Sequence, residues 1–357
     1  MSHEGNATVE GTTRYVQRFA GRAARGHFRE RDGLQLSSLG IGTYLGNPDE
    51  QTDALYKNAV VRAVQLGVNV IDSAANYRFQ RSERSIGDAL NTLFTEHGFT
   101  RDELVLCTKG GYLPFDGAPP RDVRGYIEET FVKPGIANFD DFVGGSHCMT
   151  PAYLQHQLDQ SLKNFGVESV DVYYIHNPES QLPYVSEAEF YHRLERAFER
   201  LEENRRRGKL RYYGAATWNG FRVPENSPEY HSLERMVELA RQVGGENHGF
   251  RFIQLPVNLA MVEGIDIAEH QAERLDVTAI ASASLLQARL AWQLPEQIRT
   301  QLGSLATDAQ TAIQFVRSAP GVATALVGMS RVEHVEENLA LVQIEPASNE
   351  SFSRLFS

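Results

Sequence analysis

Short apolar segments alternate with longer segments of helical periodicity along most of the chain. Residues 68–72, 104–109 and 170–176 are apolar runs rich in β-branched side chains, and each run stops abruptly at an ionisable residue. Strands that are hydrophobic throughout belong to parallel sheets that are covered on both faces. We therefore expect buried parallel strands at these three positions, with amphipathic helices between them.

The same alternation continues to the end of the chain and predicts eight strands and eight helices in strict β–α order. The strands are expected at 39–43, 68–72, 104–109, 170–176, 210–215, 252–255, 277–281 and 322–327, and the helices at 54–66, 82–97, 150–165, 187–207, 229–243, 267–273, 308–318 and 332–342. This order favours one α/β domain, a (β/α)8 TIM barrel, over a doubly wound sheet.

Three segments outside this alternation carry further expectations. Residues 1–13 are expected to form a flexible N-terminal tail before a single domain at 14–357, which begins with a β-hairpin of 14–19 and 27–31. A long loop, 110–149, follows the third strand. Because it is rich in aromatic residues, we expect a lid that closes over a substrate pocket. The alternative is that the loop packs on the side of the barrel.

Composition and charge narrow the class of protein. A hydrophobic content of 41% and a charged content of 23% are typical of a globular protein. The net charge of −11 argues against nucleic acid as a partner, because binding to phosphate relies on a basic surface. The chain has two cysteines, no secretory signal and no apolar run long enough to span a membrane. We therefore expect a cytoplasmic protein that acts on a small molecule.

Four side chains suited to proton transfer lie at or just after the ends of three predicted strands: Asp72, Tyr77, Lys109 and His176. Polar residues at the carboxyl ends of barrel strands are typical of catalytic sites. A phenol has a pKa of about 10, which a neighbouring ammonium lowers by favouring the phenolate. A carboxylate can keep the ammonium charged, and an imidazole can orient a carbonyl. This combination indicates a proton-donating site for the reduction of C=O.

Several sequence motifs occur in the order found in one enzyme family. The segment 67–90 (GVNVIDSAANYRFQRSERSIGDAL) resembles the signature of the aldo-keto reductases. It is followed by TKG at 108–110, IHNP at 175–178, GKLRYYG at 208–214, FIQLPVN at 252–258 and LVGMSRVEHVEENL at 326–339. The resemblance implies a (β/α)8 oxidoreductase that uses a nicotinamide cofactor.

The resemblance also implies a role for each of the four side chains. Tyr77 matches the general acid that protonates the carbonyl oxygen as hydride arrives. Lys109 matches the residue that lowers the pKa of the tyrosine, and Asp72 matches the carboxylate paired with that lysine. His176 matches the imidazole that orients the carbonyl. Beyond these matches, Tyr44, Trp218 and Asn219 follow strand ends and are expected to contact the substrate.

NADP(H) is the cofactor that the resemblance implies, with NAD(H) less favoured. Gln254 matches a residue that binds the nicotinamide carboxamide, Ser330 is expected to cap the last helix, and Arg331 is expected to bind phosphate as a planar fork. The full set of expected cofactor contacts is Thr43, Asp72, Thr217, Gln254, Ser282, Leu285, Gly328, Ser330, Arg331, His334, Glu337 and Asn338.

The chain departs from the family pattern beside the expected nicotinamide. Ala216 and Thr217 stand where the family commonly has Ser-Asn, and Ser282 stands where an aromatic residue usually stacks on the ring. A proline and a glycine that follow are replaced by Ser284 and Ala288.

The predicted function is hydride transfer between NADP(H) and an aldehyde, a ketone or the corresponding alcohol. Two alternatives stay open. One is a sugar or alcohol dehydrogenase that works in the oxidative direction with Tyr77 as base. The other is an NADP-binding sensor or accessory subunit, which the potassium-channel β subunits of this family illustrate. No metal is expected, because His147 and Cys148 are adjacent and lack a companion pair of ligands.

Overall fold

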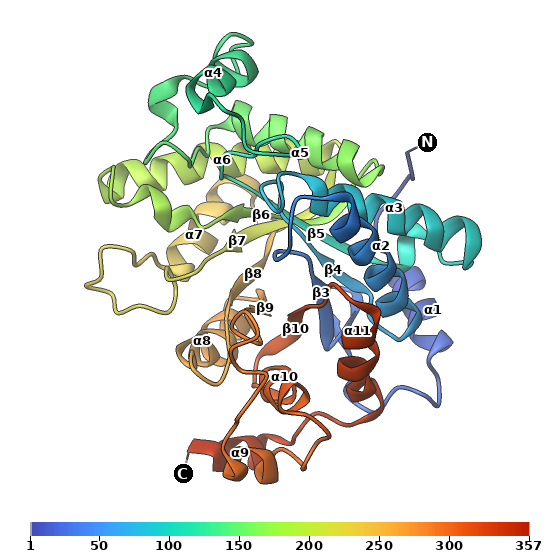
Figure 1. Cartoon of the computed structure of the whole chain (residues 1–357). Coiled ribbons are helices and arrows are strands. Elements are labelled where there is room, and N and C mark those ends of the chain that lie inside the picture. The colour runs from blue at the N-terminus through green and yellow to red at the C-terminus, as the bar shows by residue number, and fades with distance from the viewer. Residues whose placement is uncertain (1, 357) are drawn as a thin grey trace.

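Eight parallel strands form a closed barrel in the computed structural model, which describes residues 2–356 (Figure 1). The strands are β3 (Leu39–Gly42), β4 (Val70–Asp72), β5 (Val105–Gly110), β6 (Val170–His176), β7 (Leu210–Ala216), β8 (Phe250–Pro256), β9 (Thr278–Ser282) and β10 (Val322–Gly328). They follow one another around the barrel in chain order, and β10 pairs with β3 to close it. The predicted (β/α)8 barrel is confirmed.

Helices surround the barrel on its outer side (Figure 1). Those that follow the barrel strands are α2 (Glu50–Gln65), α3 (Arg81–Glu96), α5 (Pro151–Phe165), α6 (Glu187–Arg206), α7 (Leu233–Gly244), α8 (Glu263–Asp266) with a π-helical turn at Ile267–Ala272, α10 (Asp308–Ser318) and α11 (Val332–Leu339). All eight predicted helices are present, with shifted ends. For example, α7 begins four residues later than predicted because Ser232 caps it by accepting a hydrogen bond from the Arg235 backbone N–H.

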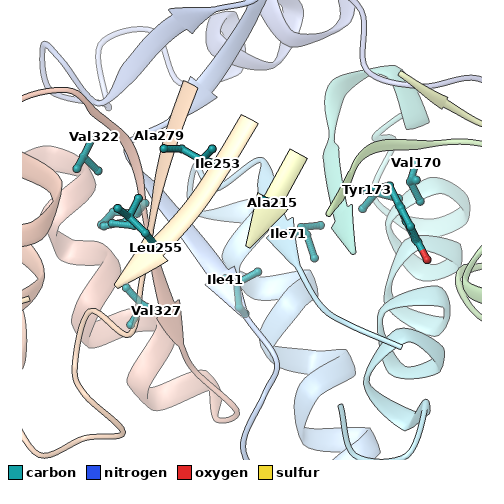
Figure 2. Packing of buried hydrophobic residues seen from close by; sticks show 14 of the residues in the cluster. Ile41, Ile71, Val170, Tyr173, Ala215, Ile253, Leu255, Ala279, Val322 and Val327 are labelled. Atoms are coloured by element: carbon teal, nitrogen blue, oxygen red, sulfur yellow. The ribbon is translucent and has the colours of Figure 1, made fainter. Parts of the chain in front are cut away.

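Two apolar layers hold these elements together. Side chains on the outer face of the strands, such as Ile41, Ile71 and Ile253, pack against the helices (Figure 2). Side chains on the inner face, such as Val172 and Phe252, fill the interior of the barrel. The alternation follows from the two-residue period of a strand, and it makes the barrel interior a packed core.

A β-hairpin covers the amino end of the barrel. It pairs β1 (Phe28–Arg31) with β2 (Leu34–Ser37), and Leu34 and Leu36 join the interior cluster. The hairpin itself was predicted, but one of its two strands was wrong: residues 14–18 lie in helix α1 (Val9–Arg18), and β1 pairs with β2 instead. Gly11, Thr12 and Tyr15 are buried at helical spacing, so the burial period is that of a helix.

The N-terminal segment is packed against the barrel. Ala7 is fully buried, and its backbone N–H donates to Asp171 Oδ1 at 2.6 Å. The backbone N–H of His3 donates to the carbonyl of Gly166 at 2.9 Å. These contacts do not match the flexible tail predicted for residues 1–13, because the segment satisfies buried polar groups of the barrel. Met1, and Ser357 at the predicted domain end, lie outside the described residues.

The chain also contains short helices that the apolar pattern did not predict. They are α4 (Val123–Ile127), α9 (Glu296–Gln301) and α12 (Asn349–Ser353). Within residues 2–356, no helix is both long enough and apolar enough to cross a membrane.

The long loop after β5 forms a separate apolar cluster outside the barrel. Its helix α4 and the π-helical turn Glu128–Val132 lie beyond α5 and α6 (Figure 1). The rings of Phe131 and Phe142 pack on Tyr153 of α5, with centroid distances of 5.3 and 5.2 Å. The predicted lid is therefore wrong. These aromatic residues bury their surface against α5, which was the alternative expectation, and of the loop only Tyr112 reaches the cavity described below.

Phe131→Ala should therefore lower stability and leave substrate selection unchanged. The ring is 1% exposed, and truncation of a buried phenylalanine costs about 3–5 kcal/mol. Denaturant unfolding would measure the loss, and the Michaelis constant KM of any accepted substrate should match that of the wild type. An altered KM with wild-type stability would show that the loop acts as a lid after all.

Candidate active site

A buried ion pair forms the floor of the site. Lys109 at the end of β5 donates from Nζ to Asp72 Oδ2 at 2.6 Å and to the carbonyl of Ser73 at 2.7 Å. Gln254 on β8 donates from Nε2 to the other carboxylate oxygen of Asp72 at 2.8 Å. Burial works to lower the pKa of Lys109, but the negative charge of Asp72 and the hydrogen bond to its carboxylate oppose that fall, and the pKa is raised. The ammonium is therefore held in its charged form.

Tyr77 lies beside this ion pair. Its ring centroid is 4.8 Å from Lys109 Nζ, 4.9 Å from the ring of Tyr44 and 5.8 Å from the ring of His176. Burial raises the pKa of Tyr77, and the positive charge of Lys109 opposes that rise. The lowering that the sequence predicted is thus present but outweighed. The phenol is protonated at neutral pH and can donate its proton.

His176 at the end of β6 is held neutral and in place. Burial is the main cause of its lowered pKa, and the charge of Lys109 adds to it. The carbonyl of His176 accepts from His147 Nε2 at 2.8 Å, because His147 Nδ1 accepts from Gln181 Nε2 at 2.8 Å. Tyr112 packs edge-on against the imidazole, with a centroid distance of 5.1 Å. The ring of His176 therefore faces the site as a neutral group.

A cavity of about 530 Å³ opens above these residues at the carboxyl ends of the strands. It brings together eleven of the residues expected at the site: Thr43, Tyr44, Asp72, Tyr77, His176, Thr217, Trp218, Gln254, Ser282, Leu285 and Gly328. Lys109 lies beneath them and contacts the site through Asp72 and Tyr77. One cavity thus joins the proton-donating group to most of the expected cofactor and substrate contacts.

A comparison with known protein families agrees with this geometry. The model of the aldo/keto reductase family matches residues 38–232, more than half of the 357-residue chain. The chain belongs to the aldo/keto reductase family.

Two individual relatives match most of the chain at low sequence identity. The L-glyceraldehyde 3-phosphate reductase of Escherichia coli O157:H7 is 25% identical over 353 residues, covering 91% of this chain and 89% of that protein. A protein of Schizosaccharomyces pombe, named as a candidate voltage-gated potassium channel subunit beta, is 24% identical and covers 88% of this chain and 87% of its own length.

Solved structures show the same fold. The aldo/keto reductase of Klebsiella pneumoniae, crystallised with NADP and acetate, superposes with a TM-score of 0.63 at 19% identity and covers 93% of this chain and 94% of that one. A glycerol dehydrogenase of Gluconobacter oxydans gives a TM-score of 0.63 at 18% identity, with 93% and 95% covered.

Some expected contacts lie outside the cavity. Asn219 uses its side chain within its own loop, donating to Glu229 Oε2 and accepting from Arg222, so a substrate contact by this side chain is not supported. The other residues outside are on or next to α11: Ser330, Arg331, His334, Glu337 and Asn338.

The start of α11 differs from the prediction. Arg331, not Ser330, occupies the N-cap position, and no side chain caps the helix. The Arg331 side chain is exposed and makes no ion pair or hydrogen bond to another residue in 2–356. Asn338 is buried, and its Oδ1 has no hydrogen-bond partner within the same range. Glu337, by contrast, accepts from Thr307 Oγ1 at 3.1 Å. The Arg331 guanidinium and the buried Oδ1 of Asn338 are thus both available to bind another molecule.

The loop after β9 forms one wall of the cavity in a strained conformation. Ala283, Leu286, Gln287 and Ala288 have φ angles of 54°, 44°, 55° and 67°. These angles are uncommon for residues other than glycine. Ser284 helps to hold the loop by donating from Oγ to the carbonyl of Leu326 at 2.7 Å. Ala288, which stands where the family pattern has a glycine, thus adopts the left-handed backbone conformation that glycine favours.

Polar residues of the cavity wall that were not among the expected site residues include Asn76, Tyr112, Asn177 and Gln287. Asn177 directly follows His176 and Tyr112 lies three residues after Lys109, so their place just past strand ends was the available signal. Within residues 2–356, no group of three or more His, Cys, Asp or Glu side chains is arranged to hold a metal ion.

Proposed function

We propose that this protein is an NADP(H)-dependent oxidoreductase that reduces an aldehyde or ketone to the alcohol, with Tyr77 as general acid. The observation that carries the proposal is the buried Asp72–Lys109 pair beneath the Tyr77 ring, on the floor of a cavity that His176 also faces. A protonated phenol beside a fixed ammonium is suited to donating a proton and then carrying the resulting negative charge.

The roles of the protein side chains follow from this arrangement. The reduced nicotinamide, when bound, supplies the hydride to the carbonyl carbon. Tyr77 gives its hydroxyl proton to the carbonyl oxygen, and the phenolate that remains is stabilised by the Lys109 ammonium. Asp72 keeps that ammonium charged and in position. A neutral His176 can donate one hydrogen bond to the same carbonyl oxygen, which orients the substrate.

The residues present fit a nicotinamide dinucleotide. Gln254 donates a hydrogen bond from Nε2 to Asp72. Its Oε1 can accept a hydrogen bond from a carboxamide N–H at the cavity wall. At the other end, the uncapped amino end of α11 and the free Arg331 suit a phosphate, and the Oδ1 of Asn338 suits a donor such as an amino group of a base. Ser282 cannot stack on the ring as an aromatic side chain would, so we expect the wall at Thr217 and Leu285 to position it.

Arg331→Ala should reduce the preference for NADPH over NADH. The guanidinium has no carboxylate partner among the described residues and can pair with the 2′-phosphate. A hydrogen bond to a charged group contributes about 1.5–3 kcal/mol, so NADPH affinity should fall by roughly 10- to 150-fold while NADH affinity changes little. Fluorescence titration of both nucleotides measures the ratio. An unchanged ratio would remove Arg331 from the phosphate site.

The lining of the cavity favours an uncharged carbonyl compound. Tyr44, Leu45 and Trp218 present exposed apolar surface at its rim, and the described residues that line it include no lysine or arginine. A phosphate or carboxylate group on the substrate would lose water without gaining a cationic partner.

A turnover assay tests the proposal. Purified protein would be supplied with NADPH and a panel of aldehydes, ketones and sugars, and with NADP and the corresponding alcohols, while nicotinamide absorbance is followed. Saturable turnover of at least one pair, lost in Tyr77→Phe, supports the proposal. Initial rates in the two directions, measured at the same pH and at equal concentrations of substrate and nucleotide, show which direction the protein catalyses faster.

A second candidate is a nucleotide-binding accessory subunit with weak or no turnover. Similarity to the Schizosaccharomyces pombe protein and the unusual Ala216 and Ser282 at the cavity wall favour it. It predicts NADPH binding without turnover of any substrate in the panel.

A further inference from the structure

Glu179 is a buried carboxylate that lies next to the cavity but does not line it. It belongs to the short 3-10 turn Pro178–Gln181, directly after β6 and His176. The side chain is 5% exposed. A carboxylate in such a place must be compensated by hydrogen bonds or by an opposite charge, because burial of an unpaired charge is costly.

Most of that compensation comes from the loop that carries Trp218. Glu179 Oε1 accepts backbone N–H bonds from Trp218 at 2.7 Å, Asn219 at 3.0 Å and Gly220 at 3.4 Å. Three consecutive N–H groups therefore converge on one carboxylate oxygen. The other oxygen lies 3.6 Å from Nε2 of His231, which is 1% exposed.

The surroundings of His231 are tightly packed. The ring of His231 stacks on Phe190 at 5.8 Å, and a Cβ added to Gly220 would lie 2.0 Å from His231 Nε2. Burial works to raise the pKa of Glu179, but the nearby His231 ring and the hydrogen bonds from backbone N–H groups outweigh it and lower the pKa. The carboxylate is therefore charged at neutral pH and holds its N–H partners firmly.

The hydrogen-bond partners of the backbone change between Thr217 and Trp218. Up to Thr217 the chain is held by main-chain bonds of the barrel, from Asn177 N to the carbonyl of Ala216 and from Thr217 N to the carbonyl of Gln254. From Trp218 onward, Glu179 takes over this role. The expected cofactor contact, Thr217, and the expected substrate contact, Trp218, are thus fixed by different groups.

We propose that Glu179 is the positioning residue for the substrate side of the cavity: its carboxylate fixes the backbone of residues 218–220 and thereby the Trp218 wall. The consequence for catalysis rests on the proposed function, whereas the consequence for Trp218 does not. Loss of the carboxylate frees the Trp218 wall while the Thr217 contact and the Asp72–Lys109 floor stay in place.

The experiment uses Trp218 as its own reporter. The chain has two tryptophans, and the other, Trp292, is 70% exposed and outside the cavity, so Trp292→Phe provides a background with Trp218 alone. In that background we compare Glu179→Ala, Glu179→Gln and the control Glu225→Gln, which removes an exposed carboxylate from the same loop. Acrylamide quenching of Trp218, KM for a carbonyl substrate, kcat and the NADPH dissociation constant are measured.

Glu179→Ala should increase quenching of Trp218 and raise the substrate KM by at least about tenfold, the factor that about 1.4 kcal/mol represents. The NADPH dissociation constant should stay within about twofold, which is under about 0.5 kcal/mol. Glu179→Gln retains an acceptor oxygen and should give an intermediate change, and Glu225→Gln should give none.

A lower unfolding midpoint with unchanged quenching and unchanged KM in both Glu179 variants would overturn the proposal, since it would show a role in stability alone. If Glu179→Ala does not fold, Glu179→Gln decides, because wild-type quenching and KM in that variant would overturn the proposal equally. Changed quenching in a protein that turns over no substrate would support Glu179 as the holder of the Trp218 wall and contradict the proposed function instead.

Discussion

Tyr77→Phe should lower kcat by about 10²–10⁴-fold and leave NADPH binding nearly unchanged. The substitution removes only the hydroxyl, so the ring keeps its packing beside Lys109, Tyr44 and His176. Burial keeps this phenol protonated, and the raised pKa of Lys109 makes its ammonium a weaker proton donor. Steady-state kinetics with a substrate from the panel, together with nucleotide titration, measures both effects.

Tyr44→Phe is the matched control for this variant. It removes a hydroxyl from the adjacent ring, whose centroid lies 4.9 Å from that of Tyr77, but Tyr44 is 54% exposed and has no contact with the ion pair. We expect a change in KM at most. Equal losses of kcat in the two variants would mean that Tyr77 is not the acid.

Lys109→Met should abolish most activity and also destabilise the fold. Asp72 would be left buried without its cation, and breaking a buried ion pair by removing one partner costs about 3–5 kcal/mol. The phenolate formed by proton donation would lose its stabilising charge, so kcat should fall at least as far as in Tyr77→Phe. Denaturant unfolding and steady-state kinetics separate the two losses.

The double variant Asp72→Asn/Lys109→Met further separates the loss of stability from the loss of activity. It removes both charges, so much of the lost stability should return while activity stays low. Recovery of activity together with stability would show that the ion pair serves only the fold. Stability as low as that of Lys109→Met alone would show that the cost comes from lost packing of the lysine stem.

The sequence predicted the barrel well because its strands are buried on both faces. A strand such as Val170–His176 is apolar almost throughout, and that pattern is independent of the rest of the fold. The same logic located Asp72, Lys109 and His176, since a polar residue that ends such a run must lie at the rim. The resemblance to the family then supplied their roles, and the geometry brings them together.

The errors concern segments whose structure depends on distant partners. Residues 14–19 were mistaken for a strand because they span fewer than two helical turns, which is too short a stretch to show the period of a helix. The packing of α1 on residues near 100 is also invisible in the sequence. Aromatic residues of the loop after β5 could cover either the cavity or α5, and composition does not say which. Glu179 was overlooked because its partners are backbone N–H groups, which have no signature in a sequence.

The hydrogen bond from the backbone N–H of Ala7 to Asp171 joins residues 164 positions apart, and Asp171 also holds the backbone N–H of Leu106 and the guanidinium of Arg101. Ribosomes extend a chain by about 5–20 residues per second, so the segment around Ala7 emerges roughly 8–33 s before its partner does. During that interval the nascent chain must keep this segment free of aggregation and of wrong pairings. We therefore expect a fusion or truncation at the amino end to lower the yield of newly made protein before it changes the properties of the folded protein.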